Sequence, residues 1–183
     1  MPPSHQEQSS VKTPSTPALV ATQRPGSAYR VIEFTTQEHI DDIIALAVLF
    51  HAEISPHLNF EPAVIQYYAD AIKADYDREN YNAYIAYREH EPVGFLVCKM
   101  VPYFFNRDRL AQQELWYVRP GYRGTRVAFD LIRAFEDWAK LRGAVEIWTG
   151  QANENANTGK KVSKVLAKIG YPRIGSYHRK VML

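Results

Sequence analysis

Beyond residue 28, apolar and polar residues follow two periods along the chain. Short runs rich in β-branched and aromatic residues predict strands at 29–35, 81–89, 93–100, 114–120 and 144–150, with one more within 171–183. Apolar residues repeated every three to four positions predict four helices: one behind residue 35, one from Pro62, one ending near Arg142, and one over 160–170. The order β-α-α-β-β-β-α-β-α-β predicts an α/β (mixed α+β) domain, with a central mixed sheet flanked by helices.

Local signals place several boundaries of these elements. Thr35, followed three residues later by Glu38, forms a capping-box pattern for the first helix. The turn at 90–92 joins two strand-like runs into an antiparallel hairpin. The segment 103–113 reads as a loop or as the end of that hairpin.

Residues 1–27 differ in composition from the rest of the chain. They are rich in Pro, Ser, Thr and Gln, and they carry too few core-forming residues to offset the entropy of ordering them. We therefore expect a flexible tail at 1–27 and one domain at 28–183.

Charge and cysteine content limit the classes of function. The net charge of +2, from 22 basic and 20 acidic residues, argues against a nucleic-acid partner. Cys98 is the only cysteine, so neither an internal disulfide nor a cysteine metal cluster can form, and we expect no metal. No signal peptide or membrane-spanning run is visible, which favours a cytoplasmic protein without a membrane partner. The sequence leaves a homodimer open.

The most informative segment joins the strand that ends at Val118 to the long helix. It reads Arg119-Pro120-Gly121-Tyr122-Arg123-Gly124-Thr125-Arg126-Val127-Ala128. A helix start exposes unpaired backbone N–H groups and the positive end of the helix dipole, and the glycine allows a close approach to the backbone. The pattern indicates an anion site; a plain turn with solvated arginines is the alternative.

This segment resembles the GNAT acetyltransferase superfamily, whose turn V-x-P-x-x-R/Q-G leads into the loop R/Q-x-x-G-x-G/A. The order of elements from Tyr29 to Leu183 is similar to that of the family, and so is Ala167-Lys168-Ile169-Gly170-Tyr171, which resembles its E-K-L-G-F ending. Some members with this style of loop are encoded by bacteriophages. The resemblance implies acetyl-CoA as cosubstrate and the GNAT fold, with a mostly antiparallel sheet.

The resemblance also implies roles for particular residues. Backbone groups of the loop would hold the pyrophosphate of coenzyme A, backbone atoms of two strand residues would align its pantetheine arm, and an asparagine would bond that arm. In sequence order, these cofactor-binding candidates are Tyr117, Val118, Arg123, Gly124, Thr125, Arg126, Val127, Ala128 and Asn155.

Glu114 resembles the glutamate that acts as general base through water in many relatives, although a surface carboxylate is the alternative. His51 and Glu53 lie where relatives build the acceptor pocket. Arg126 replaces the usual second glycine of the loop, and Leu166 replaces the tyrosine that protonates the leaving thiolate. Ser163, Tyr177 or solvent would then serve as the acid.

We expect an N-acetyltransferase that transfers the acetyl group of acetyl-CoA to a primary amine of a small molecule or a protein by direct attack. Two alternatives stay open. One is a non-catalytic module of the same fold with a binding or regulatory role, and the other is a toxin-like acetyltransferase of aminoacyl-tRNA.

Overall fold

The computed structural model of the chain describes residues 27–75, 78–150 and 156–175. Residues 1–26 of the predicted tail, residues 176–183 of the segment predicted to hold the last strand, and two candidate site residues, Asn155 and Tyr177, lie outside the described residues. The elements in chain order are β1 (Tyr29–Glu33), α1 (Gln37–Ile54), α2 (Pro62–Ala74), β2 (Tyr81–Arg88), β3 (Glu91–Pro102), β4 (Arg109–Val118), η1 (Pro120–Tyr122), α3 (Val127–Leu141), β5 (Glu146–Trp148) and α4 (Ala156–Lys168).

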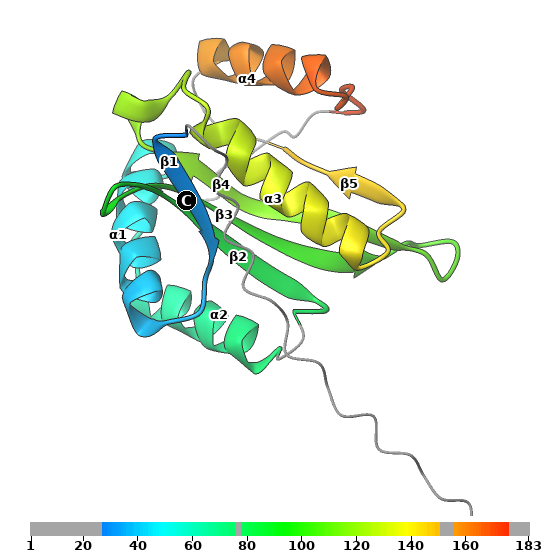
Figure 1. Cartoon of the computed structure of the whole chain (residues 1–183), viewed down its shortest axis with the longest axis horizontal. Helices are drawn as coiled ribbons and strands as arrows, with labels where there is room; N and C mark the ends of the chain where they lie inside the picture. Colours follow the sequence, from blue (N-terminus) through cyan, green and yellow to red (C-terminus); the bar gives the residue numbers. More distant parts are fainter. Residues whose placement is uncertain (1–26, 76–77, 151–155, 176–183) are drawn as a thin grey trace, which may run out of the picture.

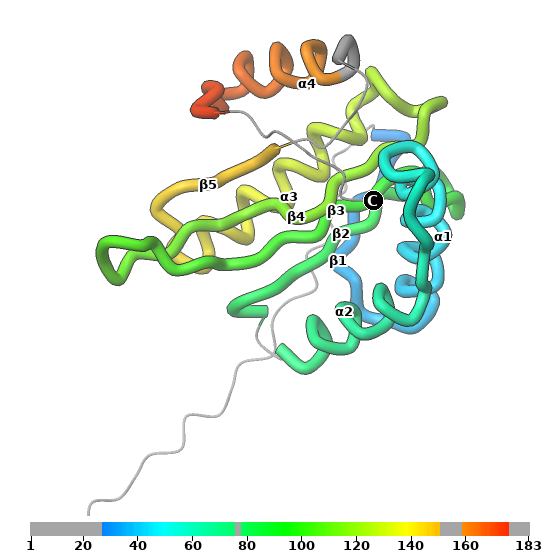
Figure 2. Tube along the Cα trace, turned by 180° about the vertical axis from the view of Figure 1, so that it is seen from behind, coloured from blue at the N-terminus to red at the C-terminus, as the bar shows by residue number. Residues whose placement is uncertain are grey.

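The strands form one sheet in the order β1-β2-β3-β4-β5. The pairs β1–β2, β2–β3 and β3–β4 are antiparallel, whereas β5 pairs parallel to β4 because α3 carries the chain back between them. Helix α3 lies on one face of the sheet, and α1 and α2 lie on the other (Figures 1 and 2). The predicted fold class, a mixed and mostly antiparallel sheet flanked by helices, is therefore confirmed.

Each face of the sheet builds its own hydrophobic core. Along β3, Phe95 packs into the core beneath α1 and α2, whereas Leu96 and Cys98 pack into the core beneath α3. This alternation follows from the period of two in a strand, and it explains why the central strands read as nearly continuous apolar runs. Across the described residues, none of the helices has the length and apolar character needed to cross a lipid bilayer.

Several boundaries differ from those predicted, and two of these differences change the interpretation. The capping box of α1 is one residue later than expected: Thr36 accepts a hydrogen bond from His39 N–H (3.3 Å), and the His39 ring accepts one from Thr36 N–H (3.4 Å). In addition, β4 begins at Arg109, within the segment predicted as loop, because Leu110 and Ala111 pair with Val101 and Met100 and are buried.

Candidate active site

The edge of β4 on the side of β5 is only partly paired. Strand β5 pairs only with Leu110, Ala111 and Gln112, and from Gln113 to Val118 no further strand lies along that side of β4 within the described residues. The side chain of Gln113 closes the end of the pairing, since its Oε1 accepts hydrogen bonds from Thr149 Oγ1 (2.9 Å) and Gly150 N–H (3.1 Å). Such an edge offers backbone groups to an extended ligand.

A β-bulge lies where the two strands part. Val97 pairs with Leu115 and Cys98 pairs with Gln113, so Glu114 is the extra residue on β4. The expectation that Glu114 starts its strand is thus wrong, because β4 begins five positions earlier, at Arg109. The bulge sets a carboxylate at the start of the open edge.

Glu114 has a cationic neighbour on β3. Its Oε1 lies 3.0 Å from Lys99 Nζ, and the two side chains are 36% and 29% exposed. Lys99 follows Cys98, which faces α3, so the alternation along β3 directs Lys99 to the face covered by α1 and α2. The carboxylate of Glu114, which contacts Lys99, is therefore held at that face and remains accessible to solvent.

The connection from β4 to α3 contains the predicted anion site. It begins with the η1 turn, and Gly124 adopts a φ of 83°, in the left-handed region that favours glycine. The N–H groups of Arg123 and Thr125 bond to Pro120 O and Tyr122 O within the turn, both at 3.3 Å.

Alternate amides of this connection are left free. In the part of the chain that the structure describes, the backbone N–H groups of Gly124, Arg126 and Ala128 have no hydrogen-bond acceptor, and α3 starts at Val127. Unpaired amides at the start of a helix fit a pyrophosphate. The structure thus narrows the candidate cradle from six consecutive residues to these three amides.

The three arginines around this connection differ in their partners. Arg123 is engaged on three sides: its Nη2 lies 2.5 Å from Glu53 Oε2, its Nε donates to Val118 O (2.8 Å), and its guanidinium lies 5.6 Å from the centre of the Tyr117 ring. Arg119 pairs with Glu91. Among the described residues, Arg126 pairs only with Asp130, one helical turn away at 3.6 Å, and its side chain is 57% exposed. It is the best placed of the three to meet a phosphate.

The predicted acceptor residues lie at the end of α1. Glu53 forms an ion pair with Arg123, so the candidate acceptor residues and the candidate cofactor loop are in direct contact. The half-buried His51 packs its ring against Phe60, with 5.4 Å between the ring centres. Tyr117 is buried against Phe50, and this burial raises the pKa of its hydroxyl above the ordinary value.

The candidate acids lie farther along the chain. Ser163 is half-buried on α4, and Leu166, one turn later, is buried. Tyr171, which follows the end of α4, donates a hydrogen bond from its hydroxyl to Glu136 Oε1 on α3 (2.8 Å).

Sequence reasoning missed Lys99, Gln113 and the pair formed by Glu91 and Tyr122, all of which shape this region. Each acts through a contact between residues far apart in the sequence. Only Gln113 could have been noticed from the local sequence, because it is a polar residue at a position where a buried strand usually has an apolar one.

Comparison with known proteins identifies the protein family of this chain. A family model described as "Acetyltransferase (GNAT) family" matches residues 46–158, which span the bulge, the open edge and the cradle. A comparison with curated proteins finds no match. The chain belongs to the GNAT acetyltransferase family, whose enzymes take the acetyl group from acetyl-CoA.

Solved structures share the fold at low sequence identity. AAC(6')-Iy in complex with the bisubstrate analogue CoA-S-monomethyl-acetylneamine is 17% identical, over 85% of this chain and 100% of that one, with a TM-score of 0.63. A ribosomal-protein-alanine N-acetyltransferase from Brucella melitensis biovar Abortus 2308 is 17% identical, over 86% and 99%, with a TM-score of 0.61. A transcriptional regulator from Bacillus halodurans C-125 is 16% identical, over 83% and 98%, with a TM-score of 0.66.

Proposed function

We propose that this GNAT enzyme transfers the acetyl group of acetyl-CoA directly to a primary amine of a small molecule or a protein, with Glu114 as general base. The observation that carries the proposal is the position of Glu114, whose bulge lies where the open edge of β4 begins. That edge leads straight to the unpaired amides before α3.

The cosubstrate fits the backbone groups available along this path. The amides of Gly124, Arg126 and Ala128 would hold the pyrophosphate, and Arg126 would add a positive charge through its exposed guanidinium. The pantetheine arm would lie along Tyr117 and Val118 in the manner of an added strand. Val118 O already accepts a hydrogen bond from Arg123 Nε, so the arm would have to share this oxygen with Arg123.

The chemistry needs a proton acceptor and correct orientation. The attacking amine loses a proton as the new C–N bond forms and the thioester C–S bond breaks. Glu114 would accept that proton through a water molecule, and Lys99 would fix the orientation of its carboxylate. The leaving thiolate takes a proton from Ser163, Tyr177 or solvent, since a thiol pKa of about 8.5 makes thiolate an adequate leaving group.

The acceptor would approach from the face covered by α1 and α2, where Lys99 and Glu114 lie, with His51 and Glu53 at the end of α1 as the candidate contacts. Two of the structural neighbours point to acceptors of their own: AAC(6')-Iy holds a bisubstrate analogue that contains acetylneamine, and the Brucella protein is named for the alanine of a ribosomal protein. Both acceptors are amines, and they define the first compounds to test.

A panel assay tests this function. The protein is mixed with acetyl-CoA and, separately, with aminoglycosides, small primary amines and peptides that begin with alanine, and coenzyme A release is followed with a thiol reagent. The only cysteine, Cys98, is fully buried, so the protein itself contributes little signal. Amine-dependent release supports the proposal. Acetyl-CoA binding without release for any amine would favour a non-catalytic module instead, and acetylation confined to aminoacyl-tRNA would favour the toxin-like alternative.

A further inference from the structure

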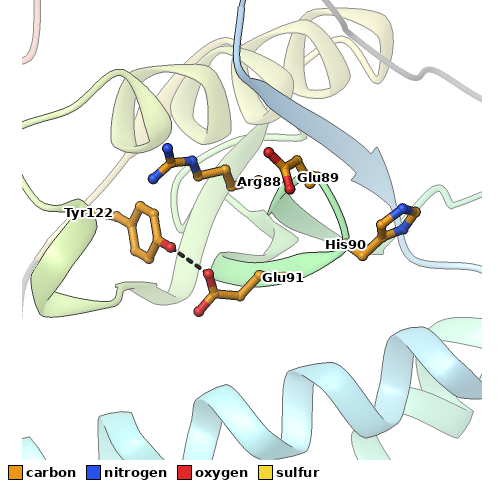
Figure 3. A pocket seen from close by; sticks show the side chains of 5 residues that line it. All are labelled: Arg88, Glu89, His90, Glu91 and Tyr122. Atoms are coloured by element: carbon orange, nitrogen blue, oxygen red, sulfur yellow. Dashed lines mark hydrogen bonds between the residues drawn. The ribbon is translucent and has the colours of Figure 1, made fainter.

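Glu91 is the first residue of β3, and each of its carboxylate oxygens contacts a different residue of the connection between β4 and α3. Oε1 forms an ion pair with Arg119 Nη1, and Oε2 accepts a hydrogen bond from Tyr122 OH at 2.5 Å. Figure 3 shows this hydrogen bond across an open cavity of about 450 Å³, lined by Arg88, Glu89, His90, Glu91 and Tyr122. The side chain of Glu91 thus contacts the residue that precedes the η1 turn and the last residue of that turn.

Tyr122 is also held by its surroundings. The edge of its ring meets Tyr29, with 6.4 Å between the ring centres, and the guanidinium of Arg88 lies 6.0 Å from the centre of the ring. Contacts from β1, β2 and β3 therefore converge on a single residue of the connection.

From Tyr122, the contacts pass directly to the cradle. The carbonyl of Tyr122 accepts hydrogen bonds from Thr125 N–H (3.3 Å) and from Thr125 Oγ1 (2.6 Å). These two bonds close the turn that contains Gly124 and precedes Arg126. The backbone amides of Gly124 and Arg126 are the unpaired ones described above. The direction of those amides therefore depends on where Tyr122 is held.

We propose that Glu91 is a positioning residue for cosubstrate binding, which holds the cradle amides in their binding arrangement through Tyr122 and Arg119. This inference rests on the family's use of acetyl-CoA and on the cradle assigned above. It does not depend on Glu114 or on the identity of the acceptor. A loop that is ordered before binding loses less conformational entropy on binding, so the effect should appear in affinity for acetyl-CoA rather than in the chemical step.

The charge state of Glu91 suits this role. The hydrogen bond from Tyr122 is the largest cause that holds the pKa of the Glu91 carboxyl below its ordinary value, and the nearby guanidinium of Arg119 acts in the same direction. The carboxylate is therefore ionised at neutral pH and accepts from both partners.

The test measures the dissociation constant of acetyl-CoA by calorimetry on the full chain. Glu91→Ala should raise it about tenfold, Tyr122→Phe should raise it about threefold, and the double variant should match Glu91→Ala alone, because the hydroxyl acts through the carboxylate. The matched control is Glu89→Gln, which removes a carboxylate from the same cavity, has no hydrogen-bond or ion-pair partner among the described residues, and should leave affinity unchanged.

Steady-state kinetics separate positioning from a general loss of stability. With an active acceptor, Glu91→Ala should raise KM for acetyl-CoA about tenfold and leave kcat within about twofold. If that variant does not fold, Tyr122→Phe and Glu91→Gln carry the same comparison. Unchanged affinity in Glu91→Ala and Tyr122→Phe, or equal effects of Tyr122→Phe with and without Glu91, would overturn the inference. Failure of the unaltered protein to bind acetyl-CoA would instead refute the cofactor assignment.

Discussion

The carboxylate of Glu53 lies 2.5 Å from the guanidinium of Arg123 and joins the end of α1 to the connection that leads into α3. The two residues are 70 positions apart in the sequence. This ion pair connects the candidate acceptor residues with the candidate cosubstrate loop. A substitution at either residue should therefore affect the binding of both acceptor and cosubstrate.

Removing the charge of Glu53 should weaken cosubstrate binding only slightly. Both side chains are about one third exposed, and Arg123 keeps its bond to Val118 O and its contact with Tyr117. Glu53→Gln should therefore change the free energy of unfolding by less than about 1 kcal/mol and raise the dissociation constant of acetyl-CoA by about threefold.

Arg123→Lys is the companion variant, because it keeps the charge and loses the planar group that serves three partners at once. It should weaken acetyl-CoA binding by about tenfold, more than Glu53→Gln does. Calorimetric titration measures both variants. Affinity in Arg123→Lys equal to that of the unaltered protein would show that Arg123 acts as a simple charge.

Two glycines of the same connection separate backbone conformation from steric fit. A Cβ at Gly124 or at Gly121 would meet no atom within 4 Å, but only Gly124 has a positive φ, of 83°. Gly124→Ala should lower the free energy of unfolding by about 1 kcal/mol and weaken acetyl-CoA binding by about tenfold, since relaxation of φ would turn the neighbouring amides away.

Gly121→Ala, at a position in the η1 turn, should leave both quantities nearly unchanged. Urea unfolding and calorimetry of the pair provide the comparison. Tolerance of alanine at residue 124 without loss of affinity would mean that the cradle does not depend on this conformation.

The helix cap at His39 should make stability sensitive to pH. His39 Nδ1 accepts hydrogen bonds from Thr35 N–H (3.1 Å) and Thr36 N–H (3.4 Å), so the ring must be unprotonated at that nitrogen. Burial is the largest cause that lowers the pKa of His39 below 6.5, and it outweighs the opposite effects of Glu38 and Asp42.

A lowered pKa in the folded state means that the unfolded chain takes up this proton first as pH falls. The contribution of His39 to stability is therefore present above about pH 6.5 and declines as pH falls below that value. His39→Gln keeps a side chain suited to a capping box but cannot titrate. Urea midpoints between pH 8 and 5 should fall more steeply for the unaltered protein than for His39→Gln, and parallel curves would exclude the cap as the cause.

The parts of the fold that local chemistry controls could be predicted from the sequence. Pro120 and Gly121 end the strand, and Gly124 marks the turn before α3, because each restricts or frees its own backbone. The position of the candidate cradle was predicted in this way. The capping box was misplaced by one residue because Thr35 and Thr36 are chemically equivalent, and tertiary contacts such as that of the His39 ring with Tyr87 (6.4 Å) are absent from local sequence patterns.

The contacts that shape the site could not be predicted in the same way. The bulge at Glu114 depends on the register between two strands, and Lys99 and Glu114 meet only once that register exists. Glu91 reaches Tyr122 across 31 positions. Local propensity carries no information on such pairings. The same holds for Gly94: a Cβ at this position would lie 2.8 Å from Tyr117 O on the neighbouring strand, a close approach that only the paired strands reveal.

Comparison of Glu114→Gln with the unaltered protein tests the central claim most directly. With an active amine, the variant should lose about 10²-fold in kcat/KM at neutral pH, within the usual contribution of a general base. The dissociation constant of acetyl-CoA should stay unchanged, because Glu114 contacts Lys99 rather than the cradle. The loss should shrink at high pH, where the free amine needs no base. Activity equal to that of the unaltered protein across the whole pH range would contradict the account and move the base elsewhere, with His51 and Glu53 as the next residues to test.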